Sequence, residues 1–173
     1  ITPAAGYFGP ISRAAASSAV VVTPSNPSNP STGLSGGEAS LEDFDAKDGN
    51  DSDTSEGAEG VEIMAFEFDV EDGDASVNRV DVVFQNDSSS VGDEEPWNVF
   101  DSLTLLADGK KVAELDASDE DEWSEEGNTS PESYRARFTG MDVVVDEGET
   151  VEFTVEADIA SNVDDVTSSV DVN

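Results

Sequence analysis

The strongest constraint on the fold is a strict alternation of apolar and polar side chains between residues 151 and 159. The apolar members are Val151, Phe153, Val155, Ala157 and Ile159, and the side chains between them are polar or acidic. Successive side chains of a strand point to opposite faces, so this segment is predicted to be a strand with one buried face. No window longer than two turns has the apolar spacing that an amphipathic helix requires.

Two earlier segments alternate in the same way. Residues 64–70 and residues 79–84 both place an apolar side chain at every second position, and the side chains between them are charged except at Ala65 and Val83. An acidic turn that contains Gly73 separates them. Because neighbouring strands joined by a short turn usually form a hairpin, we expect these two strands to pair.

A third pair of strands is marked by Asp108-Gly109. This dipeptide lies between the apolar runs 103–107 and 112–115, which is the strongest short-range signal of a β-hairpin. Further strands are expected at residues 134–138, 143–145 and 166–172. Together with 21 valines, the segments predict an all-β fold, a single antiparallel β-sandwich of about seven or eight strands with an extended N-terminal arm.

Two of these segments carry a family resemblance. The runs Leu103–Leu115 (LTLLADGKKVAEL) and Met141–Ile159 (MDVVVDEGETVEFTVEADI) resemble Ig-like β-sandwich modules of prokaryotic surface and filament proteins and of virion accessory (decoration) proteins. The resemblance covers residues 61–173 and lacks the Cys and Trp pattern of antibody-type domains. It implies an Ig-like module that displays or connects surfaces and has no catalytic residues.

Composition excludes several classes of function. The 173 residues include 41 Asp or Glu, only seven Lys or Arg, and neither His nor Cys, for a net charge of −34. Nucleophilic triads, zinc sites of the usual ligands and disulfides are therefore excluded. Such a surface repels nucleic acids and anionic lipids, whereas it attracts cations. Paired carboxylates have no diagnostic value among so many acids, and we expect the protein not to be an enzyme.

The charge is divided unevenly along the chain. Residues 1–37 contain one charged side chain, Arg13, whereas the remainder has 41 acids against six bases, a net charge of −35. A tandem of Pro, Ser and Asn residues follows Val22, and closely spaced prolines favour an extended spacer. We therefore expect four parts: an uncharged arm (1–22), a Pro/Ser/Asn/Gly linker (23–37), an acidic irregular segment (38–60) and the sandwich (61–173).

The arm is the candidate subunit contact. Its apolar stretch 14–22 is too short to span a bilayer, which needs about 20 residues, so we expect no direct membrane insertion. One interpretation is a terminus that stays disordered. The other is an arm that adds a strand to a neighbouring subunit, because uncharged, β-branched residues can be buried there without loss of ionic hydration. The candidate contact residues are Tyr7, Phe8, Ile11, Ala14, Ala15, Ala16, Val20, Val21 and Val22.

Metal binding and glycosylation give further candidates. Calcium prefers carboxylate and amide oxygens, which Asp48, Asn50, Asp51 and Asp53 offer, and a second acidic cluster spans residues 116–121. The first cluster does not match an EF-hand loop, so the alternative is an acidic surface that holds diffuse cations, and no cofactor is required. Candidate glycosylation sequons begin at Asn50, Asn86 and Asn128.

Three arginines form the candidate partner patch. Arg135 and Arg137 are two residues apart in an expected strand and therefore share a face; Arg79 lies in another strand. One interpretation is that they offset neighbouring carboxylates. The other is that they receive the acidic surface of another subunit.

These features favour a non-enzymatic structural subunit of an extracellular assembly, such as a filament, pilus or surface layer, in a saline exterior that screens the charge. Its partners would be copies of itself. The first alternative is a virion accessory protein that grips a capsid, tail or shell protein through the same arm. The second is a cation-dependent adhesion or carbohydrate-binding module, for which Ca²⁺ is the candidate cation.

Overall fold

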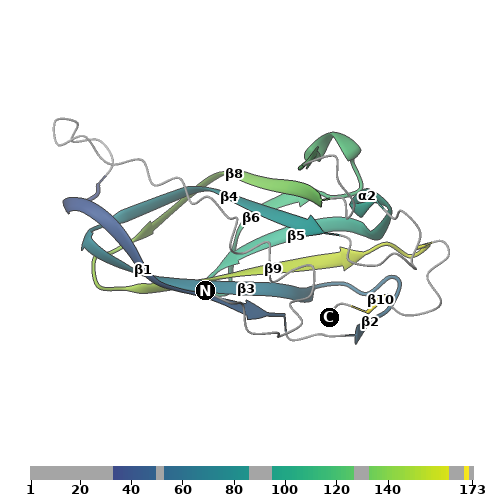
Figure 1. The fold of residues 1–173 in the computed structure, drawn as a ribbon, viewed down its shortest axis with the longest axis horizontal. Helices are drawn as coiled ribbons and strands as arrows, with labels where there is room; N and C mark the ends of the chain where they lie inside the picture. The colour runs from purple at the N-terminus through teal and green to yellow at the C-terminus, as the bar shows by residue number, and fades with distance from the viewer. Residues whose placement is uncertain (1–32, 50–52, 86–94, 127–132, 164–169, 172–173) are drawn as a thin grey trace, which may run out of the picture.

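The computed structural model describes residues 33–49, 53–85, 95–126, 133–163 and 170–171. It confirms the all-β prediction, because two antiparallel sheets of five and three strands form a sandwich (Figure 1). The larger sheet has the order β1 (Gly36–Asp48), β3 (Val61–Gly73), β9 (Thr150–Ile159), β5 (Phe100–Ala107) and β6 (Lys110–Asp116).

The smaller sheet has the order β4 (Ala75–Gln85), β8 (Ser133–Val145) and β7 (Trp123–Glu125). The remaining elements are short. Strands β2 (Asp53–Thr54) and β10 (Val170–Asp171) pair with each other, α2 spans Pro96–Val99, and a 3₁₀ turn spans Glu120–Glu122. Strand β10 is the described portion of the strand expected at residues 166–172.

Alternating side chains fill the space between the sheets. In β9 every second residue from Val151 to Ile159 is buried, as the sequence predicts. Phe153 lies at the centre, where its ring stacks on Phe66 (5.2 Å between centroids) and on Phe68 (6.0 Å). Trp123 closes one end of the core, because its ring packs on Phe84 and its Nε1 donates to the Ala117 carbonyl at 2.9 Å.

The Asp108-Gly109 hairpin is confirmed. Strands β5 and β6 pair from Ser102 with Asp116 to Ala107 with Lys110. Asp108 and Gly109 both have positive φ angles, 49° and 71°, which is the backbone that a two-residue turn of type I′ requires.

The expected pairing of residues 64–70 with residues 79–84 is wrong. Strand β3 pairs with β1 and β9, whereas β4 pairs with β8 in the other sheet. The chain crosses between the sheets at Gly73-Asp74, where Gly73 has a φ of 153°. A Cβ on Gly73 would lie 2.7 Å from the Gly37 carbonyl oxygen, so this crossing depends on glycine.

Residues 38–48 also differ from the expected irregular segment. They belong to β1, which pairs antiparallel with β3 at the edge of the larger sheet, with register shifts between Gly36 and Ser40 and between Glu42 and Asp45. The sandwich therefore begins at Gly36 rather than at Val61. Leu41 packs against the core, and Phe44 stacks on Phe66 at 5.8 Å although 46% of its surface remains exposed. β1 has no continuous run of apolar residues, and these two side chains supply its apolar contacts with the sheet.

Candidate interaction surfaces

Three of the six bases that follow Gly37 lie together on the outer face of the smaller sheet. Arg79 projects from β4, while Arg135 and Arg137 project from β8; the residues Val80, Ala136 and Phe138 beside them are buried in the core. The register places Asp81 opposite Arg137 and Val83 opposite Arg135. We call this surface the arginine face and define it by Arg79, Arg135 and Arg137.

A buried carboxylate organises the arginine face. Arg137 donates from Nε and Nη2 to the two carboxylate oxygens of Asp81, at 2.9 and 3.0 Å. Asp81 is only 4% exposed, and Nε of Arg79 lies 3.6 Å from its Oδ1. Hydrogen bonding to Asp81, together with its negative charge, raises the pKa of Arg137 above its ordinary value. The guanidinium of Arg137 is thus held in one orientation by two bonds in parallel.

Arg135 has a different partner. Its Nη1 lies 2.8 Å from Oε1 of Glu126, just beyond the end of β7. Nε of Arg135 and Nε of Arg79 are both buried without a hydrogen-bond partner among the described residues. The structure therefore brings the three predicted residues together and places carboxylates beside them. Sequence analysis did not identify Asp81 and Glu126, because both pairings depend on how β4, β7 and β8 are aligned.

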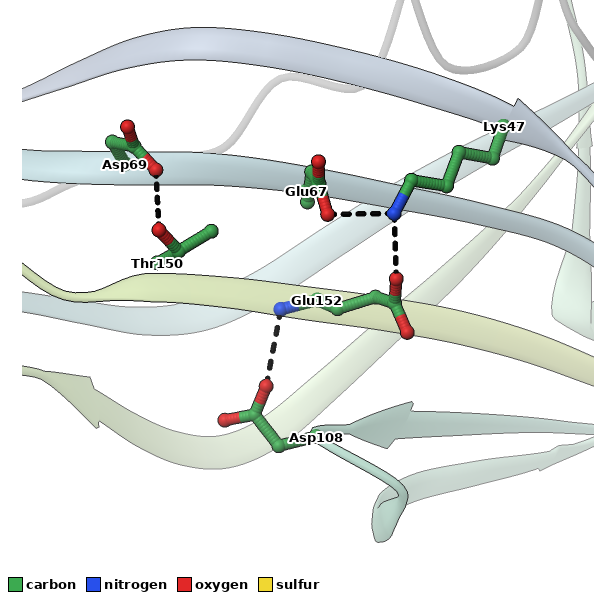
Figure 2. Close-up of polar contacts among 6 residues, drawn as sticks. All are labelled: Lys47, Glu67, Asp69, Asp108, Thr150 and Glu152. Carbon is green, nitrogen blue, oxygen red and sulfur yellow. Dashed lines mark hydrogen bonds and ion pairs between the residues drawn. The ribbon is translucent and has the colours of Figure 1, made fainter.

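The outer face of the larger sheet is acidic. Glu67 and Glu152 are directly opposed on β3 and β9, and Nζ of Lys47 on β1 bridges them at 2.6 and 2.8 Å (Figure 2). Hydrogen bonds to Glu152 and Glu67 raise the pKa of Lys47 above its ordinary value. Beside this cluster the Thr150 hydroxyl donates to Asp69 at 2.6 Å, and Asp108 accepts from the Glu152 backbone N–H at 3.2 Å. We call the outer surface of β3 and β9 the acidic face.

A third polar cluster, centred on Asp74, holds Ser35 in place just before β1. Asp74 accepts from the backbone N–H and the hydroxyl of Ser35, both at 2.6 Å, and from the backbone N–H of Glu147 at 3.0 Å. The hydroxyl and backbone hydrogen bonds from Ser35, followed by that from Glu147, lower the pKa of Asp74. One carboxylate therefore connects the residue before β1, the β3–β4 crossing and the turn that follows β8.

We expect Asp74→Ala to loosen this connection. The lowered pKa means that the ionised Asp74 stabilises the fold above its unfolded pKa, and that this contribution is lost as the pH falls through the lower folded value. Amide hydrogen exchange at Ser35 and Glu147 should accelerate in the variant at neutral pH, while exchange in β9 stays slow. Asp146→Ala, which removes an exposed carboxylate from the turn after β8 that carries Glu147, serves as the control. Unchanged exchange at Ser35 in Asp74→Ala would contradict the assignment.

Several predicted residues lie outside the described part of the chain. They are the arm residues Tyr7, Phe8, Ile11, Ala14, Ala15, Ala16, Val20, Val21 and Val22, the sequon residues Asn50, Asn86 and Asn128, and Asp51 of the first acidic cluster. The backbone of Asp48 ends β1 opposite Met64, and that of Asp53 lies in β2. Among the described residues, no group of three or more acidic side chains has a metal-binding arrangement.

The second acidic cluster has a local structural role. Asp116 accepts from the backbone N–H and hydroxyl of Ser118, and Asp119 accepts from the backbone N–H of Asp121 at the start of the 3₁₀ turn. These are the usual bonds of Asp in turns. They position Trp123, which follows the turn directly.

Comparison with protein-family models, curated proteins and solved structures finds no match to this chain. The resemblance to Ig-like surface modules stays a prediction. Within the described ranges, no helix has the length and apolar character needed to cross a bilayer.

Proposed function

We propose that the chain is a non-enzymatic structural subunit of an extracellular assembly, in which the acid-free arm joins neighbouring subunits and the acidic sandwich faces solvent. The observation that carries the proposal is the division of charge at Gly37. All 41 acids follow this residue, and the only charged side chain before it is Arg13.

The physical argument begins with repulsion. Copies that each carry a net charge of −34 repel one another in dilute buffer. An uncharged, β-branched segment such as Val20–Val22 can be buried against another copy without removing ionic groups from water. Adding a strand would also satisfy the backbone hydrogen bonds of that segment. The arm is therefore the part of the chain best suited to hold acidic domains together.

The structure supplies a fixed point from which the arm can extend. Ser35 is bound to Asp74, and the sandwich begins one residue later at Gly36. Residues 23–35 contain closely spaced prolines, and 13 extended residues would span about 40 Å at about 3.1 Å per residue. That reach suffices to connect two sandwiches that do not touch through their acidic surfaces.

Deleting residues 1–33 tests the proposal. At molar NaCl the full chain should sediment as a polymer, whereas the truncated chain should sediment as a monomer with the same thermal midpoint. High salt is required because it shortens the screening length to about 3 Å at 1 M and so suppresses repulsion between the sandwiches.

Three outcomes would contradict it. Polymerisation of the truncated chain to the same extent would show that the arm is not the connection. Failure of the full chain to assemble without a separate shell protein would instead favour the virion accessory alternative. A full chain that stays monomeric but binds a glycan in a Ca²⁺-dependent manner would favour the adhesion module.

A further inference from the structure

The two sheets of the sandwich have four edges. They are the outer sides of β1 and β6 in the larger sheet and of β4 and β7 in the smaller one, and among the described residues no further strand pairs with them. An edge presents unpaired backbone N–H and C=O groups, to which another strand can add. Natural edges are protected against such addition by bulges, by short length or by charged side chains. The protection of each edge therefore indicates where a strand could be received.

Three of the four edges are protected. β1 shifts register twice, so its longest unbroken pairing with β3 is the four residues Asp45–Asp48, and five of its side chains are acidic. β6 also shifts register, and four of its seven side chains are charged. β7 is only three residues long. Each of these edges is a poor template for a further strand.

The edge of β4 lacks this protection. From Arg79 to Gln85 the strand pairs with β8 in an unbroken register of seven residues. The only charged side chains in β4 are Arg79 and Asp81, and Asp81 is buried and bound to Arg137. In an antiparallel pair every second residue directs its N–H and C=O to the partner, so the alternate residues of 79–85 direct theirs away from β8. This is the longest regular edge of the sandwich and has the fewest charges for its length.

The core is incomplete beside this edge. A sheet of three strands covers a sheet of five, and it is displaced towards β6, because β8 contacts β6 and Phe84 of β4 packs on Phe100 of β5. The free side of β4 is therefore directed towards β1. There Phe44 stacks on the fully buried Phe66, yet 46% of its surface is exposed. A fourth strand beside β4 would extend the smaller sheet over this part of the larger one.

The arm has the length and composition that this position requires. Its apolar stretch 14–22 has nine residues and no charged side chain, so it can pair with all seven residues of the β4 edge. Val20–Val22 are strand-forming residues, and because side chains alternate, at least one of these valines points to the core in either register. Pro24 cannot donate a hydrogen bond to a neighbouring strand, so the added strand would end before it.

The length of the spacer favours another copy as the acceptor. Ser35 is bound to Asp74, directly before the start of β4. The 11 residues of β4 span about 36 Å at about 3.3 Å per residue, whereas residues 23–35 span about 40 Å when extended. An extended spacer thus places the arm farther from Ser35 than the whole length of its own β4. Closely spaced prolines oppose the reversal that a return to this strand would need.

We propose that residues 14–22 of one copy add to the free edge of β4 in the next copy, along Arg79–Gln85, as a fourth strand of the smaller sheet. The inference rests on the proposed function and deepens it, because it names the surface that receives the arm. The contact is heterologous, so repeated contacts build an open filament or a ring. A chain without residues 1–33 keeps the edge but has no strand to donate, in agreement with the monomer expected of it.

Cross-linking between full-length chains tests the proposal, because the native sequence has no cysteine. Ala19→Cys in the arm leaves the three valines intact, and Val83→Cys places a thiol on the β4 edge. The two variants are mixed at molar NaCl, one of them with a size tag. A short bis-maleimide joins them, since neighbouring side chains of paired strands lie about 4.5–8 Å apart. The matched control replaces Val83→Cys with Val112→Cys, a half-buried valine on the edge strand β6.

The arm should react selectively with β4. The mixed product of Ala19→Cys with Val83→Cys should exceed that of Ala19→Cys with Val112→Cys by about tenfold or more, because strand addition holds only the first pair of thiols together. Sedimentation of both mixtures before the reagent is added checks that they assemble to the same extent.

Hydrogen exchange supplies a second readout without cysteine. Alternate backbone amides of residues 79–85 should exchange about tenfold or more slowly in the assembled native chain than in a Val21→Asp chain, whose charged arm is expected to stay unbound. Amides of the β1 and β6 edges should exchange at the same rate in both chains.

The possible failures are distinguishable. Arm-dependent assembly in which the Val83→Cys product is no more abundant than the Val112→Cys product, or in which exchange slows at β1 or β6 instead of β4, would overturn this inference and leave the proposed function standing. Cross-linking of Ala19→Cys to Val83→Cys only when both lie in the same chain would place the arm on its own β4 and would also overturn it. A native chain that stays monomeric would overturn both proposals.

Discussion

Phe153→Ala should lower the free energy of unfolding by about 3–5 kcal/mol, the range for removing a fully buried aromatic ring. Phe153 has no exposed surface and lies on β9, the central strand of the larger sheet. Its ring stacks on Phe66 and Phe68, so the variant loses these contacts and leaves a cavity at the middle of the core. Domains of this kind have total stabilities of about 5–15 kcal/mol, and the variant should therefore be close to unfolding.

Phe44→Ala is the matched control. Phe44 also stacks on Phe66, at 5.8 Å, but it lies on the edge strand β1 and is 46% exposed. Its loss should cost less than about 3 kcal/mol, the lower end of the range for a buried ring, because nearly half of its surface is exposed and its removal opens no enclosed cavity. Urea denaturation at constant molar NaCl, followed by tryptophan fluorescence, measures both. Equal losses in the two variants would contradict the assignment of Phe153 to the centre of the core.

The elements that sequence analysis predicted correctly are those specified by local patterns. Strand β9 alternates without interruption from Val151 to Ile159. The β5–β6 turn needs two residues with positive φ, and Asp108-Gly109 is suited to that backbone. In both cases the residues that determine the structure are adjacent in the sequence, so no knowledge of distant partners is required.

Strand β1 was missed because its alternation is broken. Leu41 and Phe44 are three residues apart, a spacing that does not fit a regular strand. The register shifts between Glu42 and Asp45, and Asp43 has a φ of 49°, so one extra residue is accommodated there. This irregularity allows Leu41 and Phe44 to point to the same side of the sheet. A bulge of this kind is recognised only when the partner strand is known.

The predicted pairing of β4 with residues 64–70 was wrong for a similar reason. A short turn between two alternating segments usually indicates a hairpin, but Gly73 allows the chain to pass to the other sheet. For the candidate surfaces, spacing alone placed Arg135 and Arg137 on one face. The position of Asp81 beneath them depends on the alignment of β4 with β8, residues that are 56 apart in the sequence.

The central claim is that the arm joins neighbouring subunits, and a single carboxylate introduced into the arm tests it most directly. Val21→Asp in the full chain introduces a charge into the stretch that we propose to be buried between subunits, whereas Val21→Ile retains an apolar β-branched side chain. Electron microscopy at molar NaCl should show ordered assemblies for the native chain and for Val21→Ile, and only dispersed particles for Val21→Asp. Assemblies of Val21→Asp as abundant as those of the native chain would contradict the account.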